Sequence, residues 1–207
     1  QGLATNDDLA AARDLAQPGG DLPPGSVCGA LALDGTLVAR LEDQTQPPLL
    51  DGPFTLEAWV HADKLPTVNA GIASRGDVWS VGLVAASSEV RVHVFARYGD
   101  SNTIDLEGPV LPINRWSHVA VTYAITPQPQ LTIFLDGLPS MTMETSTIAS
   151  STAPITIGGA YAMSLDQALS GHLDELRVTK FARYSAAFVP SSRFSYDLDT
   201  YALYHFD

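Results

Sequence analysis

Short runs of alternating apolar and polar residues, separated by Gly, Pro, Asp and Ser, recur about every ten residues from Ala30 onward. Such alternation indicates half-buried β-strands, because successive side chains on a strand point to opposite faces. The runs predict strands at Ala30–Leu33, Thr36–Leu41, Phe54–His61, Gly71–Arg75, Trp79–Ala85, Val90–Tyr98, Thr103–Leu106, His118–Tyr123, Leu131–Leu135, Ile155–Ile157, His172–Val178 and Ala202–Phe206. These are too many strands for one open sheet, so the pattern predicts an all-β fold of two packed antiparallel sheets, a jelly-roll sandwich.

Alternation also assigns the side chains of each strand to two faces. One face of residues 54–60 is wholly apolar, and the matching face of residues 90–96 carries only valine and alanine. Because aliphatic faces pack between sheets, we expect the opposite faces to point outward. The opposite faces carry Thr55, Glu57, Trp59 and His61 on the first strand and Arg91, His93, Phe95 and Arg97 on the second. Groups of these kinds stack on sugar rings and hydrogen bond to hydroxyls; the alternative is that they are solvated or covered by loops.

The first 27 residues do not follow the strand pattern. Residues 6–15 predict a short helix capped by Asn6 or Asp7, and the Pro- and Gly-rich residues 17–25 end it. We expect residues 1–27 to form an N-terminal leader or linker and residues 28–207 to form one β-sandwich domain. With 207 residues, 45% of them hydrophobic, the chain is long enough to bury one substantial core.

The chain is acidic, with a formal net charge of −12 and a pI near 4.6. Its field therefore opposes binding to nucleic acid and to anionic membranes. No apolar segment approaches the roughly 20 residues that a transmembrane helix needs, so we expect no membrane insertion. The first residue is Gln1 rather than Met, which fits a processed protein with an extracellular or cell-surface location.

The sequence offers no recognisable catalytic arrangement. Glycosidases use clustered carboxylates, but the adjacent Asp174 and Glu175 point to opposite faces of a strand, and Glu57 stands alone on its face. No Gly-x-Ser-x-Gly motif is present. We therefore expect a protein that is not an enzyme.

Transition-metal ligands are also sparse in the sequence. The five histidines are scattered and lack the paired spacing of zinc ligands, so no zinc site is predicted. The single cysteine, Cys28, excludes an internal disulfide, and we interpret it as a small packed residue.

Four phrases of the sequence match one family in order and spacing. They are Gly29–Gly35, Phe54–Val60, Trp116–Tyr123 with Leu131–Gly137, and Ile155–Gly159 with Gly171–Val178. Over roughly residues 28–190 the chain resembles the LamG-like jelly-roll domains of the concanavalin A-like lectin/glucanase superfamily. The resemblance implies two curved antiparallel sheets packed face to face. It leaves function open, because the scaffold serves glycan binding, protein adhesion, surface attachment and, in some branches, glycoside cleavage.

Two finer expectations come from this resemblance. Many relatives hold a structural calcium ion, and the matching ligands here are Asp34, or Gly35 through its carbonyl, and Asp174; alternatively Asp34 only makes a turn. A second calcium possibility is a loop-tip site around Asp77, Asp100 and Asn102.

Family members commonly open with a strand like residues 201–207, which here come last. We expect residues 202–206 to pair near the N-terminal strands.

Together these patterns predict a non-catalytic extracellular module for binding or adhesion, belonging to a larger multidomain protein, with carbohydrate as the expected ligand. The candidate contact residues are Glu57, Trp59, Arg91, His93 and Arg97, provided that their sheet is the concave one. The alternative is a structural or protein-interaction module that has no small-molecule ligand. An exposed Trp59 in a groove would favour sugar binding, and a Trp59 buried under loops would favour the structural role.

Overall fold

The computed structural model describes residues 29–36, 39–40, 52–67, 69–98, 102–149, 151, 153–159 and 168–207. The predicted leader, residues 1–27, and Cys28 lie outside them. The strands are β1 (Leu31–Asp34), β2 (Ala39–Arg40), β3 (Phe54–Ala62), β4 (Ala70–Arg75), β5 (Trp79–Ala86), β6 (Glu89–Tyr98), β7 (Asn102–Val110), β8 (Trp116–Ala124), β9 (Gln130–Leu135), β10 (Leu138–Glu144), β11 (Ile155–Ile157), β12 (Ser170–Thr179) and β13 (Thr200–Tyr204). No helix long and apolar enough to cross a membrane occurs in this part of the chain.

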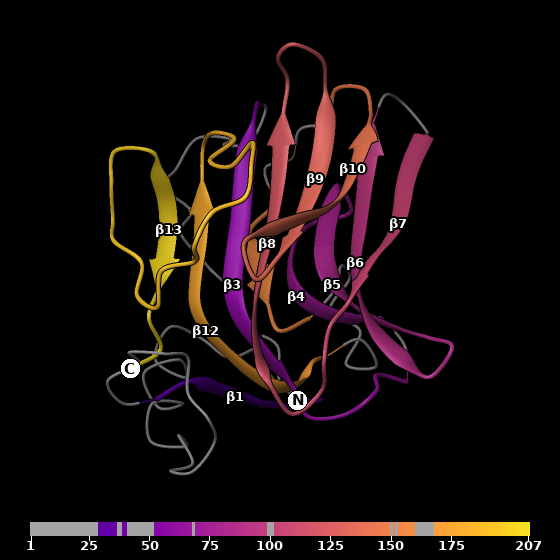
Figure 1. The fold of residues 1–207 in the computed structure, drawn as a ribbon, viewed down its shortest axis with the longest axis vertical. Helices are drawn as coiled ribbons and strands as arrows, with labels where there is room; N and C mark the ends of the chain where they lie inside the picture. The colour runs from indigo at the N-terminus through magenta and orange to yellow at the C-terminus, as the bar shows by residue number, and fades with distance from the viewer. Residues whose placement is uncertain are drawn as a thin grey trace.

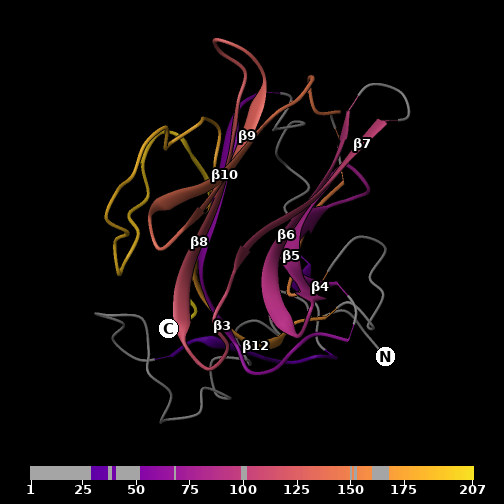
Figure 2. The ribbon, with the colours of Figure 1, turned by 45° about the vertical axis from the view of Figure 1, so that its right-hand side comes forward.

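The strands form two sheets that pack face to face (Figures 1 and 2). The seven-stranded sheet has the order β1-β12-β3-β8-β9-β10, with β13 also pairing with β12. The six-stranded sheet has the order β2-β11-β4-β5-β6-β7. Neighbouring strands pair antiparallel throughout both orders. The predicted all-β sandwich of two antiparallel sheets is therefore confirmed.

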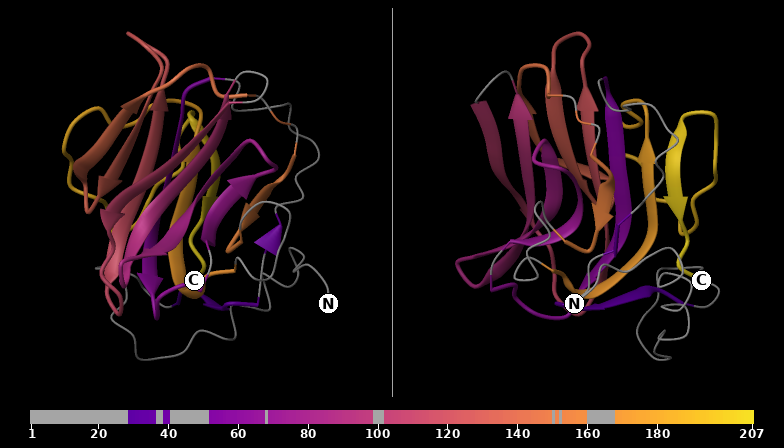
Figure 3. Two further views of the ribbon diagram at one scale, coloured as in Figure 1. Left: turned by 90° about the vertical axis from the view of Figure 1, so that its right-hand side faces the viewer. Right: turned by 180° about the vertical axis from the view of Figure 1, so that it is seen from behind.

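The core lies between the sheets and is built from the predicted apolar faces. Leu56 and Val60 of β3 are fully buried, as is Val92 of β6. Burying each such side chain contributes about 1.5–3 kcal/mol. The left view of Figure 3, turned by 90° from Figure 1, shows the layers that enclose this core. Alternation thus located the inner face of both sheets.

One strand, β10, was not predicted. Its sequence Leu-Pro-Ser-Met-Thr-Met-Glu contains a proline and no valine or isoleucine. It forms the edge of its sheet, and its pairing with β9 shifts register between Pro139 and Met141. Proline is tolerated on edge strands and at such irregularities, because a missing N–H costs little there. Each of the predicted strands overlaps an observed one.

The last strand, β13, lies beside the N-terminal part of the domain. Along one edge of β12, β1 pairs with residues 170–173 and β13 pairs with residues 176–179, while β3 takes the opposite edge. The expectation that residues 202–206 pair near the N-terminal strands is confirmed. Both short strands run in the same direction along β12, one after the other.

Residues 180–199, which we call the covering segment, cross the outer face of the seven-stranded sheet. In Figure 2 this gold stretch lies on the side of β3 and β8 that faces away from β5 and β6. Trp59 Nε1 donates to the Ser191 carbonyl at 3.0 Å, and Thr55 Oγ1 donates to the Phe181 carbonyl at 3.0 Å. This face of β3 therefore points outward from the core, as expected, and the alternative that loops cover it is the one the structure bears out.

Candidate functional site

The outer face of the six-stranded sheet carries the candidate binding surface. Phe95 of β6 is half-buried and lies outside both hydrophobic core clusters. In the sheet it stands between Ser80 of β5 and Asp105 of β7. An aromatic ring set among polar neighbours on an outward face suits the apolar side of a flat, hydroxylated ligand.

Charged side chains flank this ring in fixed pairs. His93 Nε2 lies 2.6 Å from Asp105 Oδ1, and Arg97 Nη1 donates to Asp77 Oδ2 at 2.5 Å. The Asp105 and Arg97 side chains are 73% and 41% exposed, so each pair contributes at most about 1 kcal/mol to stability. Their effect is to hold donors and acceptors in place beside Phe95.

Arg91 lies further along the same face. Its Nη2 donates to Glu89 Oε2 at 2.9 Å, and its Nη1 donates to the Gly108 carbonyl at 3.2 Å. The structure therefore brings the predicted contacts Arg91, His93 and Arg97 onto one surface with Phe95. Sequence reasoning placed Phe95 on this face but did not select it as a contact.

The other two predicted contacts, Glu57 and Trp59, do not join them. They lie on β3 in the seven-stranded sheet, whose outer face points away from that of β6 across the core. Trp59 is only 9% exposed and Glu57 is fully buried. The five predicted contact residues consequently form two separate groups. On β6, Arg91 and Arg97 reach solvent, whereas His93 is only 7% exposed.

Glu57 is the centre of a buried polar network under the covering segment. Arg177 donates to Glu57 Oε1 through Nε and Nη2 at 2.8 and 2.7 Å, and Tyr184 Oη donates to Oε2 at 2.8 Å. His118 Nε2 lies 3.2 Å from Oε2. Burial alone would raise the pKa of Glu57, but hydrogen bonding with His118 and the charge of Arg177 lower it overall. Glu57 is therefore held as a carboxylate in the interior.

The same network fastens the covering segment to the sheet. Burial and the Glu57 carboxylate raise the pKa of Tyr184 far above its ordinary value, so this phenol stays a hydrogen-bond donor. Phe194 lies under the guanidinium of Arg177, with 4.5 Å between the guanidinium carbon and the ring centre. Both oxygens of the buried Glu57 carboxylate are engaged by protein groups, an arrangement that suits packing of a segment better than turnover of a substrate.

Arg183 and Asp197 join two parts of the covering segment. Arg183 Nη2 donates to Asp197 Oδ2 at 2.6 Å. Although burial would raise the pKa of Asp197, the hydrogen bond from Thr200 and the guanidinium of Arg183 lower it to about 2. The segment is thus tied to itself as well as to the sheet.

The residues expected to share a calcium ion do not fit one site. Asp34 pairs with Ser170 of β12, four residues before Asp174 on that strand, which corresponds to roughly 13 Å. Asp34 Oδ1 accepts hydrogen bonds from Thr36 N and Oγ1 at 2.8 and 2.6 Å, the pattern of a local turn. Gly35 follows Asp34 with φ +87°. Asp174 is 1% exposed, and its Oδ1 accepts the Glu175 N–H.

The loop-tip alternative is only partly described. Asp77 is paired with Arg97, Asn102 opens β7, and Asp100 lies outside the described residues. Calcium binding itself stays a prediction, without a shared ligand set for Asp34, Gly35 and Asp174.

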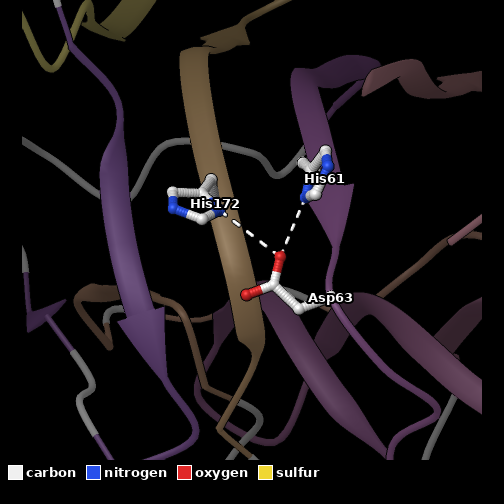
Figure 4. Close-up of side chains that lie close together, drawn as sticks. All are labelled: His61, Asp63 and His172. Atoms are coloured by element: carbon white, nitrogen blue, oxygen red, sulfur yellow. Dashed lines mark hydrogen bonds and ion pairs between the residues drawn. The ribbon is translucent and has the colours of Figure 1, made fainter. Parts of the chain in front are cut away.

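One group of metal-ligating side chains does assemble. His61 of β3, Asp63 just after it and His172 of β12 bring their ligand atoms within 4.8 Å of one another (Figure 4). Two of the histidines that are scattered in the sequence are thus brought together by the fold. The pairing of β3 with β12, which places His61 opposite His172, is the signal that the sequence alone did not supply.

A pocket of about 330 Å³ opens nearby at the end of the sandwich. It draws residues from both sheets, including Leu83 of β5 and Ser170 of β12, and Lys64 from the loop after β3. It therefore provides a hollow, separate from the Phe95 surface, in which a small ligand could be tested.

The chain belongs to the concanavalin A-like lectin/glucanases superfamily, whose Laminin_G_3 family model matches residues 33–187. No curated protein matches the sequence. Solved structures share the fold at low sequence identity. The fourth domain of AbnA, an extracellular GH43 arabinanase from Geobacillus stearothermophilus, solved with arabinotriose, is 20% identical with a TM-score of 0.55, covering 76% of this chain and 73% of that one.

Two further structures extend this comparison. A candidate carbohydrate-binding protein from Bacteroides ovatus is 21% identical with a TM-score of 0.53, covering 73% of this chain and 42% of that one. The binding domain of Paraclostridial Mosquitocidal Protein 1 is 12% identical with a TM-score of 0.59, covering 82% and 44%. The chain therefore spans less than half of these two structures, and at such identities the likeness shows the fold alone.

Proposed function

We propose that the domain is a non-catalytic carbohydrate-binding module that holds its ligand on the outer face of the six-stranded sheet. The observation that carries this proposal is the half-buried ring of Phe95 between the His93–Asp105 and Arg97–Asp77 pairs. The ring offers a stacking surface for a sugar, and the paired side chains offer donors and acceptors for its hydroxyls.

The related structures support this ligand class. The AbnA domain was solved with arabinotriose, and the Bacteroides ovatus protein is described as a candidate for carbohydrate binding. Because AbnA is an extracellular enzyme that carries this fold as one domain, we also propose an extracellular or cell-surface location and a larger multidomain protein. An acidic domain with a net charge of −12 is suited to a neutral ligand rather than to nucleic acid.

The non-catalytic part of the proposal rests on the carboxylates. A glycosidase needs a general acid whose pKa is raised, standing across a scissile bond from a second carboxylate. Glu57 and Asp197 are shifted in the opposite direction, and Glu57 is fully buried. Asp174 and Glu175 are buried as well. The burial of Glu57, Asp174 and Glu175 and the lowered pKa of Glu57 and Asp197 support a structural role for these carboxylates.

A screen of the domain on a glycan array, followed by calorimetry with the glycan that binds, tests the proposal. Phe95→Ala should weaken binding at least about tenfold, as loss of a central aromatic contact does. Tyr196→Ala is the matched control, because this aromatic side chain is 72% exposed on the covering segment, and it should leave affinity unchanged. Retained affinity in Phe95→Ala, or loss in Lys64→Ala alone, would move the site to the end pocket.

A second candidate function is a structural or protein-interaction module. The burial of Trp59 beneath the covering segment favours it, since a buried Trp59 is what a domain without sugar at that face should show. A glycan array on which the domain binds nothing, with and without added calcium, would support this second function and overturn the first.

A further inference from the structure

Two histidines and one aspartate converge at one end of the seven-stranded sheet (Figure 4). His61 on β3 and His172 on β12 are direct partners in the ladder. Their Nδ1 atoms lie 2.9 and 3.5 Å from the same atom, Asp63 Oδ1. Side chains from two strands therefore point toward one small volume.

The backbone fixes this arrangement. The ladder between β3 and β12 sets the spacing of the two histidines, and Asp63 N donates to the Ser170 carbonyl at 3.2 Å. Trp116 packs beside both imidazoles, with ring centres 5.6 Å from His61 and 6.3 Å from His172. The three side chains are thus held close together.

The cluster is also open to solvent. The side chains of His61, His172 and Asp63 are 16%, 31% and 42% exposed. An ion can therefore reach them without opening the sandwich, and a water molecule can complete its coordination.

We propose that His61, Asp63 and His172 bind a divalent transition-metal ion, with Zn²⁺ as the probe. A metal about 2.1 Å from each ligand in tetrahedral geometry separates ligand atoms by about 3.4 Å. The observed 2.9 and 3.5 Å bracket that value. Two imidazoles and one carboxylate select zinc-like ions over calcium or magnesium, which prefer oxygen ligands. Three protein ligands leave a fourth position for water.

A second acidic group, Asp174, Glu175 and Asp207, does not carry the same inference. Glu175 already accepts the Phe194 N–H and contacts His205, and Asp207 pairs with Arg193 through both oxygens. The Glu175 and Asp207 carboxylates are engaged in protein contacts, whereas the Asp63 carboxylate is engaged only by the two histidines among the contacts described.

The proposed ion would link β3 to β12 and stabilise the folded domain. This inference is independent of the carbohydrate proposal, because the cluster lies on the seven-stranded sheet and Phe95 lies on the other. Failure of one proposal leaves the other standing.

Calorimetry of chelator-treated full-length chain with Zn²⁺, combined with thermal unfolding, tests the site. We expect one equivalent to bind. At a zinc concentration 100-fold above the Kd, the melting temperature should rise by about 5–10 °C. Asp63→Asn and His172→Gln should each weaken binding at least about tenfold. Asp63→Asn changes the most exposed ligand, so its loss of binding cannot be ascribed to misfolding if its unfolding midpoint without metal is unchanged.

His93→Gln is the matched control. His93 also faces an aspartate, Asp105, but belongs to no three-residue metal group among the described residues. It should keep full zinc affinity. Replacing zinc by Co²⁺ gives a visible spectrum that reports coordination, and this spectrum should disappear in His172→Gln. Absence of saturable binding, or zinc affinity in Asp63→Asn and His172→Gln equal to that of the wild type, would overturn the site.

Discussion

The outer faces of β3 and β6 come from the same alternating pattern but end in different environments. On β3, the covering segment closes over Glu57 and Trp59, so that a carboxylate, a guanidinium and an indole are buried together. On β6, His93 and Arg97 contact Asp105 and Asp77, whose side chains are 73% and 38% exposed. Polar alternation therefore shows which residues leave the core, but whether they reach solvent depends on a third layer.

The contrast is sharpest for two similar pairs. His118 meets Glu57 at 3.2 Å with both side chains fully buried, and His93 meets Asp105 at 2.6 Å with the aspartate mostly exposed. A histidine–carboxylate pair should therefore contribute different amounts to the free energy of unfolding on the two faces. Buried charges depend on their partners, while exposed charges are solvated by water.

Glu57→Gln should have the largest effect. It leaves Arg177 as an uncompensated buried charge, and we expect a loss of about 3–5 kcal/mol in the free energy of unfolding, measured by urea denaturation. Asp105→Asn, the control on the other face, should cost less than about 1 kcal/mol. Equal losses in the two variants would show that the faces are energetically alike.

Phe188→Ala should have an intermediate effect. The Phe188 ring stacks on Tyr184 with centres 3.5 Å apart and touches His118 and Phe134, so removing it should cost about 2–3 kcal/mol. Val189→Ala, at a neighbouring side chain that is 93% exposed, should change stability by less than about 0.5 kcal/mol. Protease should cleave within residues 180–199 faster in Phe188→Ala than in wild type or Val189→Ala, which would show that the covering segment has opened.

The smallest of the three effects should be in the pH dependence of stability, and it should be specific to the face of β3 under the covering segment. The folded pKa of Glu57 is below its ordinary value of 4.5, so its contribution to stability is complete above about pH 4.5 and is lost as the pH falls through the folded pKa. Wild type should therefore lose more stability than Glu57→Gln between pH 5 and about pH 2. Parallel pH profiles for the two proteins in denaturant titrations would contradict this assignment.

Sequence alone was enough to predict the sandwich, because hydrophobic alternation and turn residues are local signals. It also placed Arg91, His93 and Arg97 on one outward face. It did not predict that Glu57 and Trp59 are buried, because nothing in the irregular residues 180–199 indicates where that segment packs. It missed the His61–His172 pair because strand register, which joins them, is a property of the fold.

The strands β13 and β1 lie one after the other along the same edge of β12. Tyr204 stands opposite Leu176, and Leu31 opposite Leu173, so the two strands form one interrupted line along β12. Figure 1 shows the C-terminal end of the chain, which follows β13, near the start of β1. A peptide bridge from Asp207 to Gly29 would join the two strands covalently through a loop, with both still paired to the same edge of β12. The domain is thus suited to circular permutation, and tandem copies of it could exchange this strand between neighbours.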